Sequence, residues 1–230
     1  VYYQIFPERF KNGDSSRTPP GAEAWGSAPT RENFMGGDLA GIAQQLDYIQ
    51  SLGATCLYLT PIFRAPSNHK YDTVDYFEID PAFGTRDDLR RLVDGVHARG
   101  MRVILDGVFN HCGWRHPLWQ DVRLRGKASR YYNWFCVYDA GELSRLPLEQ
   151  LSDRRMKVNP PYECFAFAAN MPKWNTENPE VIRYLVSIAE QWTREYGIDA
   201  WRLDVPDEVS LRFLHAFRTR MRSCNAAVYV

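Results

Sequence analysis

The sequence predicts an α/β fold in which short parallel strands alternate with helices, either as a doubly wound sheet or as a (β/α) barrel. Short apolar, β-branched runs alternate with longer segments whose apolar residues recur every three or four positions. Capping residues and glycines delimit the longer segments. With 45% apolar and 24% charged residues, the composition is that of a globular protein and argues against disordered and fibrous chains.

The expected elements follow from these patterns in chain order. Strands are expected at 1–6, 55–59, 103–105, 198–205 and 226–230, and helices at 39–52, 86–99, 179–196 and 209–221. The three longest helices have a capping residue before them and a glycine after them: Asp38 and Gly53, Thr85 and Gly100, Asn178 and Gly197. Five strands are too few to close an eight-stranded barrel.

A long segment interrupts this alternation after the third strand. Residues 108–177 show no clean period and carry many aromatic and turn residues. An insertion of about 70 residues is far longer than an ordinary connection between a strand and a helix. We therefore expect roughly 70 residues to be inserted between the third strand and the helix that begins at 179.

Charge and cysteine content limit the classes of partner. Lys plus Arg and Asp plus Glu each number 28, so the formal net charge is zero, which argues against nucleic-acid binding. No apolar run approaches the roughly 18 residues that cross a bilayer, so no membrane partner is expected. The five cysteines are widely spaced without a CxxC pair, which indicates reduced thiols. Localisation is left open, with a cytoplasmic one favoured over a secreted one, and a homo-oligomer is compatible with the sequence.

Polar residues at the ends of two predicted strands are the candidates for chemistry. In both α/β architectures, function gathers at the carboxyl ends of the strands. Arg202 and Asp204 alternate along the fourth strand, so they share a face, and the guanidinium would orient an ionised carboxylate. Such a carboxylate can attack the anomeric carbon of a sugar. A structural ion pair explains this spacing equally well, and Asp106 alone fits a turn-forming role better.

Several ordered blocks resemble the α-amylase family, glycoside hydrolase family 13. Residues 106–111 (DGVFNH) look like its first signature region and residues 197–204 (GIDAWRLD) like its second. Further blocks resemble the neopullulanase and cyclomaltodextrinase branch: 1–10, 69–73, 80–85 and 171–175. The resemblance spans essentially the whole chain. It implies a (β/α)8 TIM-barrel type fold, present here as a partial barrel of about five strands with an inserted small domain after strand three. By this resemblance, residues 1–111 would form the first part of the catalytic barrel, 112–177 the inserted small domain, and 178–230 a continuation that stops within strand five.

The resemblance also implies a retaining attack on an α-glucosidic bond. Asp204 would be the nucleophile, Arg202 would orient it, and Asp106 would support Arg202. The substrate would be a maltooligosaccharide, a cyclodextrin, pullulan or starch. The resemblance therefore favours a catalytic role for Arg202 and Asp204 over a purely structural ion pair.

Substrate-binding residues are implied by the same blocks. His111 and Asn110 would line the site, with His111 reaching sugar hydroxyls. Tyr71 would stack under the sugar that reacts, and Asp72 would fix its loop. Trp174 would be a sugar platform, as would three other tryptophans of the insertion, although core packing fits most of them better: Trp114, Trp119 and Trp134.

The sequence also departs from the family pattern. The family's general acid is a Glu at the end of strand five, which the 230 residues do not include, so we expect this fragment to be inactive by itself. Asn12, Asp14 and Asp38 resemble calcium ligands, but Arg17 and Thr18 stand where further ligands belong, so no calcium and no other cofactor is expected. Residues 205–210 (VPDEVS) differ from the branch's usual sequence, which leaves linkage preference open.

Three classes of function compete. The leading class is a glycoside hydrolase, and a transglycosylase or isomerase of the same family would use the same intermediate. A non-catalytic glucan-binding relative is the alternative outside enzymes; the joint presence of Asp106, His111, Arg202 and Asp204 argues against it. A dinucleotide-dependent dehydrogenase is disfavoured, because no GxGxxG follows the first strand.

Overall fold

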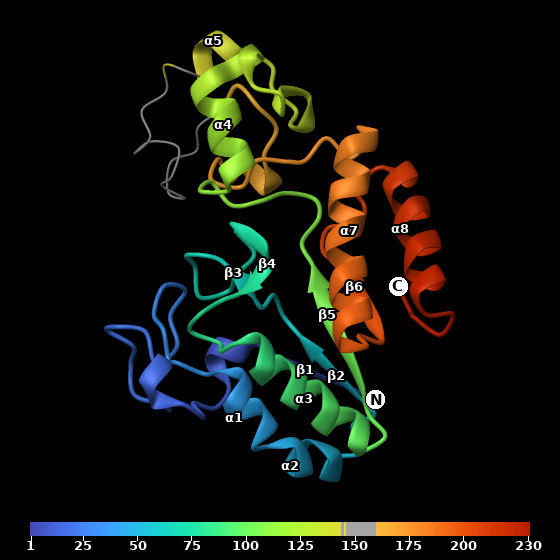
Figure 1. The fold of residues 1–230 in the computed structure, drawn as a ribbon. Helices are drawn as coiled ribbons and strands as arrows, with labels where there is room; N and C mark the ends of the chain where they lie inside the picture. Colours follow the sequence, from blue (N-terminus) through green and yellow to red (C-terminus); the bar gives the residue numbers. More distant parts are fainter. Residues whose placement is uncertain (144, 146–159) are drawn as a thin grey trace.

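A four-stranded parallel sheet organises the protein, and helices follow its strands (Figure 1). The structure is a computed structural model and describes residues 1–143, 145 and 160–230. The strand order is β1-β2-β5-β6, with bounds Tyr2–Ile5, Cys56–Leu59, Arg102–Gly107 and Ala200–Leu203. Every neighbouring pair in this sheet is parallel. The expected α/β partial barrel is therefore confirmed.

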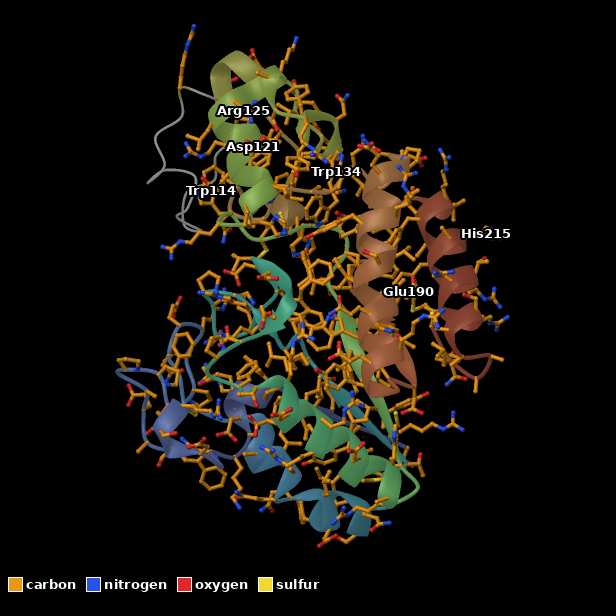
Figure 2. All side chains as sticks on the ribbon, in the orientation of Figure 1. Trp114, Asp121, Arg125, Trp134, Glu190 and His215 are labelled. Atoms are coloured by element: carbon orange, nitrogen blue, oxygen red, sulfur yellow. The ribbon has the colours of Figure 1, made fainter. Side chains whose placement is uncertain are left out.

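Five of the described helices follow the strands along the chain (Figure 1). Their bounds are α1 Leu39–Ala43, α2 Leu46–Ser51, α3 Arg86–Ala98, α7 Pro179–Tyr196 and α8 Leu211–Cys224. Helix α1 contacts α3, α3 contacts α7, and α7 contacts α8. The side chains of Asp38, Thr85 and Asn178 accept hydrogen bonds from backbone N–H groups in the first turns, as the sequence predicts. Glu190 of α7, marked in Figure 2, pairs with Arg220 of α8 at 2.7 Å and so joins the last two helices.

The two faces of the sheet differ in chemistry. Leu57, Leu59, Val103 and Leu105 belong to the main hydrophobic core. The alternate positions on the same strands form a separate small cluster of Cys56, Ile104 and Ala200, against which Tyr58 packs. Because side chains alternate along a strand, this second face also carries polar groups towards the strand ends.

Two local features differ from the sequence expectation. The segment 39–52 forms two short helices, since a hydrogen bond from Gln45 N to Ile42 O tightens the chain between them. The segment 60–85, expected as a loop, contains an antiparallel pair of β3 (Phe63–Arg64) and β4 (Asp75–Ile79). Two residues are too few to produce a strand pattern in the sequence.

The expected fifth strand is not formed as a strand. Residues 226–230 contribute one isolated parallel bridge, between Tyr229 and Ala200. Two hydrogen bonds support it, from Trp201 N to Tyr229 O at 3.0 Å and from Tyr229 N to Asp199 O at 3.1 Å. The chain therefore runs beside β6 where a fifth strand would pair, but the pairing is limited to this bridge.

The insertion forms a lobe at one end of the sheet (Figure 1). Its helices are α4 (Pro117–Arg125) and α5 (Ala140–Leu143), and isolated bridges such as His111 to Lys173 tie it back to the end of β5. Short 3-10 turns complete the described elements: Pro7–Arg9, Ser15–Arg17, Gly126–Ala128, Tyr132–Trp134 and Phe165–Phe167. Part of the expected small domain, residues 144 and 146–159, lies outside the described residues, and its boundaries stay a prediction.

In the part of the chain that the structure describes, no helix combines the length and the apolar character that crossing a bilayer requires.

Truncation of a core leucine should reveal how much the packing of α3 contributes to the stability of the fold. Leu92 is fully buried on α3, so Leu92→Ala should lower the free energy of unfolding by about 2–5 kcal/mol through lost burial and a residual cavity. Leu124→Ala, on α4 where the side chain is 69% exposed, should change it by less than about 0.5 kcal/mol. Urea unfolding measures both, and equal effects of the two changes would contradict the assigned core.

Candidate active site

The carboxyl ends of β5 and β6 bring the predicted acidic residues together. Asp106 of β5 lies opposite Arg202 of β6 in the parallel register. The backbone N–H of Asp204 donates to Gly107 O at 3.0 Å, which continues the pairing by one step. Strand pairing therefore places two carboxylates and a guanidinium at the same edge of the sheet.

The Arg202 guanidinium is shared between both carboxylates. Its Nη1 lies 2.5 Å from Asp204 Oδ1 and 3.3 Å from each oxygen of Asp106. The side chain of Arg202 is 43% exposed, whereas those of Asp106 and Asp204 are 0% and 12% exposed. One cation thus partly neutralises two buried acids, and the face sharing expected for Arg202 and Asp204 is found.

Asp106 is the more deeply buried acid and is held by three groups. Besides Arg202, the hydroxyls of Tyr58 and Tyr71 donate to its Oδ2 at 2.5 and 3.1 Å. Burial raises the pKa of Asp106 to about 6, although the Tyr58 hydrogen bond and the Arg202 charge oppose that rise. Its ionisation state therefore changes close to neutral pH.

Asp204 has one charged partner and a constrained backbone. Burial also raises the pKa of Asp204, against the hydrogen bond from Arg202, and the Glu208 charge adds to the rise. Val205, the next residue, has φ +49° and precedes Pro206. This left-handed backbone is costly for a β-branched residue, and it follows directly after the carboxylate, just beyond the end of β6 at Leu203.

His111 and Asn110 lie behind the site and are fully buried. Burial lowers the pKa of His111 to about 4, so the ring is neutral at pH 7. Its Nε2 lies 3.1 Å from Tyr71 O and its Nδ1 lies 3.4 Å from Asn110 Nδ2. The structure therefore shows His111 supporting the Tyr71 backbone, while the expected contact with sugar hydroxyls stays a prediction.

Tyr71 and Asp72 occupy the loop that precedes β4. Tyr71 is half-buried and its hydroxyl donates to Asp106, while its expected stacking on the reacting sugar stays a prediction. Asp72 is buried and accepts a hydrogen bond from Ser67 Oγ in the same loop. Asp72 thus has the contacts of a residue that fixes this loop.

A buried ion pair also constrains the turn that carries Tyr71. Lys70 adopts φ +62°, and its Nζ donates to Asp80 at 2.6 Å and to Ala65 O at 2.9 Å. Loss of one partner would leave a buried charge uncompensated, which is strongly destabilising. This pair holds the backbone on one side of Tyr71 as His111 does on the other.

The tryptophans expected as sugar platforms are buried in the inserted lobe. Trp174 is 2% exposed, stacks on Phe135 with ring centres 4.6 Å apart, and points its Nε1 at Tyr76 Oη 3.4 Å away. Trp114, Trp119 and Trp134 are at most 9% exposed. Trp114 lies beside α4, and Trp134 lies against Tyr184 of α7 (Figure 2). These rings pack the core of the lobe, so the structure does not place them to stack on a sugar.

Several residues at the site were not found from the sequence. Tyr58 donates to Asp106, and its signal was its period-two position on β2, facing Ile104. Lys173 pairs with Glu208 at 3.1 Å. Phe165 stacks on His111 with ring centres 4.8 Å apart. These two contacts join the insertion to the ends of the strands. Neither contact has a local sequence signal, because the partners are distant in the chain.

The residues expected as calcium candidates do not fit a calcium ion. The Asp38 carboxylate accepts the N–H groups of Gly13, Asp14 and Gly41. Asp14 pairs with the Arg17 guanidinium at 2.8 Å, and Asn12 donates to Thr18. The described residues contain no group of three or more His, Cys, Asp or Glu side chains that could hold a metal ion. No step is assigned to a metal, and independence from cofactors stays a prediction.

The arrangement suits nucleophilic attack at an electrophilic carbon. Arg202 fixes one Asp204 oxygen and favours its ionised form, which leaves the carboxylate oriented at the open edge of the sheet. Asp106 pairs with Arg202, and Asp106 in turn accepts hydrogen bonds from the Tyr58 and Tyr71 hydroxyls.

Comparisons with known proteins show the family of this chain. Residues 4–221 match the model of the α-amylase catalytic domain. The chain is 51% identical to a cyclomaltodextrinase of Geobacillus thermopakistaniensis and 49% identical to an intracellular maltogenic amylase of Bacillus subtilis, and it aligns over its whole length with both. It spans only 37% of the length of each of these relatives.

A solved structure shows the same fold. The cyclic α-maltosyl-(1→6)-maltose hydrolase of Arthrobacter globiformis superposes with a TM-score of 0.90 at 43% identity, covering all of this chain and 49% of that one. The same hydrolase has been solved in complex with maltose. With a family model matched over nearly the whole chain, this protein belongs to the α-amylase family, glycoside hydrolase family 13, and forms part of its catalytic domain.

Proposed function

We propose that the protein is a retaining glycoside hydrolase that acts on α-glucosidic bonds through a covalent intermediate on Asp204. The observation that carries this proposal is the Arg202 guanidinium, which holds Asp204 at 2.5 Å and Asp106 at 3.3 Å at the carboxyl end of the sheet. A nucleophilic carboxylate must be ionised and fixed in direction, and this pairing provides both conditions.

The reaction divides into two displacements at the anomeric carbon. In the first, an Asp204 oxygen forms a bond to that carbon while the bond to the leaving sugar oxygen breaks, and that oxygen takes a proton from an acid. In the second, water attacks the same carbon, the bond to Asp204 breaks, and the proton of the water passes to the conjugate base. Tyr71, beside Asp106, would pack against the reacting sugar.

We assign no proton donor among the described residues. Asp106 is held by Arg202, Tyr58 and Tyr71, and Glu208 is paired with Lys173. Without an acid, the first displacement would have to expel an alkoxide, which is a poor leaving group. We therefore expect the 230 residues by themselves to release no sugar, while the complete gene product does.

The substrate class is proposed from the relatives. Proteins named cyclomaltodextrinase, maltogenic amylase and neopullulanase share 47–51% identity with the chain. We propose maltooligosaccharides, cyclodextrins, pullulan or starch as substrates. An intracellular location is proposed with them, since one relative is named an intracellular maltogenic amylase.

Replacement of the nucleophile should abolish turnover. Asp204→Asn keeps the size of the side chain but removes its charge, so kcat on cyclodextrin should fall by about a thousandfold or more. Asp207→Asn alters an exposed acid three residues on and should leave kcat within about threefold. Release of glucose and maltose from cyclodextrin, pullulan and starch by the complete gene product measures both. Equal loss in the two variants, or none in Asp204→Asn, would contradict the assignment.

The pH profile should report on Asp106. Its pKa of about 6 means that protonation removes one of the two carboxylates that hold Arg202 as the pH falls, so kcat/KM should decline below about pH 6. Tyr58→Phe removes a hydrogen bond that favours the ionised form, so the acidic limb should move to higher pH.

The control for this shift is Tyr138→Phe, which alters a tyrosine that is 69% exposed in the inserted lobe. It should leave the acidic limb in place. An unchanged limb in Tyr58→Phe, or a move to lower pH, would show that Asp106 does not set it.

A further inference from the structure

One tryptophan differs from all the others in its exposure. The chain contains seven tryptophans, and six of them are at most 9% exposed. Trp25, in the connection between β1 and α1, is 70% exposed. An indole ring can offer a flat apolar face to an amphipathic ligand, and Trp25 is the tryptophan of the described residues that leaves this face exposed.

The Trp25 ring is nevertheless held in place. Its Nε1–H donates to Phe10 O at 2.5 Å, which ties the indole to the segment after β1. The Arg9 guanidinium donates to Thr30 O at 2.8 Å and to Asn33 Oδ1 at 2.7 Å, so it fixes the far end of the loop that carries Trp25. Because the indole N–H is already bonded to the backbone, the ring is oriented before any ligand arrives, which lowers the entropy cost of stacking.

A cavity of about 630 Å³ lies beside this ring. Trp25, Phe6 and Met35 give it apolar walls, and Arg9, Arg31 and His69 give it polar ones. Arg9 is already bonded within the protein, whereas Arg31 forms no ion pair with any described residue and keeps its donors available. A flat ring together with free guanidinium donors suits a sugar, which has apolar C–H faces and hydroxyl edges.

One residue links the lining of the cavity to the candidate active site. His69 lines the cavity, and its ring centre lies 5.8 Å from that of Tyr71. The Tyr71 hydroxyl in turn contacts Asp106. A chain of sugars that reaches from Asp204 to Trp25 would pass Tyr71 and then His69.

We propose that Trp25 and Arg31 form an outer sugar site that binds a glucose unit of an α-glucan several units away from the bond that is cleaved. This inference rests on the proposed function and deepens it: Trp25 selects longer maltooligosaccharides over maltose. Trp25 stacks on the sugar, and Arg31 donates to its hydroxyls. Phe10 and Arg9 are positioning residues for the ring and its loop.

Direct binding to the complete gene product tests this site without depending on turnover. Calorimetric titration with maltohexaose and with maltose is carried out in an Asp204→Asn background, which prevents hydrolysis during the measurement. Trp25→Ala should weaken maltohexaose binding about tenfold, or about 1.4 kcal/mol, and leave maltose binding within about twofold. Trp25→Phe, which keeps an aromatic ring, should retain most of the affinity.

Acrylamide quenching gives a second readout at the ring itself. Maltohexaose should protect part of the tryptophan fluorescence of the unaltered protein, and that protection should disappear in Trp25→Phe although binding persists. Tyr48→Ala is the matched control: this tyrosine is 52% exposed on α2 and lines a separate cavity on the other side of Trp25. It should leave both readouts unchanged.

The outcomes separate the two proposals. Unchanged maltohexaose binding in Trp25→Ala, or an equal loss in Tyr48→Ala, would overturn the outer sugar site while leaving the hydrolase proposal intact. Failure of the protein with unaltered Trp25 to bind either sugar would instead contradict the proposed function.

Discussion

The Arg202 guanidinium, shared by Asp106 and Asp204, is the interaction on which the rest of the site depends. Two buried acids and one cation leave an excess of negative charge in a poorly solvated place, and such charges are costly unless they are paired and hydrogen-bonded. The hydroxyls of Tyr58 and Tyr71 supply the remaining hydrogen bonds to Asp106. The raised pKa of Asp106, to about 6, shows that this compensation is incomplete.

Several elements of the fold hold Arg202, Asp106 and Asp204 in position. Parallel pairing of β5 with β6 sets Asp106 opposite Arg202, and the strained Val205 follows the second acid just beyond the end of β6. The Tyr71 turn is held on one side by the buried pair of Lys70 and Asp80 and on the other by the neutral His111 ring. Through Phe165 and Lys173, the inserted lobe supports the same region. Each of these contacts thus helps to hold the residues around the Asp204 carboxylate in place.

The parts predicted from the sequence were those with local causes. Asp38, Thr85 and Asn178 cap helices through bonds to backbone groups a few residues away, so their effect is visible in the sequence. The two-residue strand β3 depends on its pairing with β4, and it was missed. The break at Gln45 was also missed, because its hydrogen bond to Ile42 O interrupts a segment whose apolar pattern continues through it. The single bridge at Tyr229, in place of a full fifth strand, likewise depends on pairing with β6.

In the candidate site, too, the residues found from the sequence were those with a local pattern. Strand alternation predicted that Arg202 and Asp204 share a face, whereas Tyr58 could be found only once the register between β2 and β5 was known. Composition could not separate aromatic rings that pack a core, such as Trp174, from one left in solvent, such as Trp25. The environment of a ring, not its presence, decides its role.

The central claim is that Asp204 forms a covalent bond to the sugar, and trapping that bond tests it most directly. A fluorinated α-glycosyl fluoride that forms the intermediate quickly and loses it slowly is incubated with the complete gene product, which is then digested and analysed by mass spectrometry. The account predicts one added glycosyl group on the peptide that contains Asp204, and none when that residue is Asn. A label on Asp106, Glu208 or another residue, or turnover of the reagent without any trapped adduct, would contradict it.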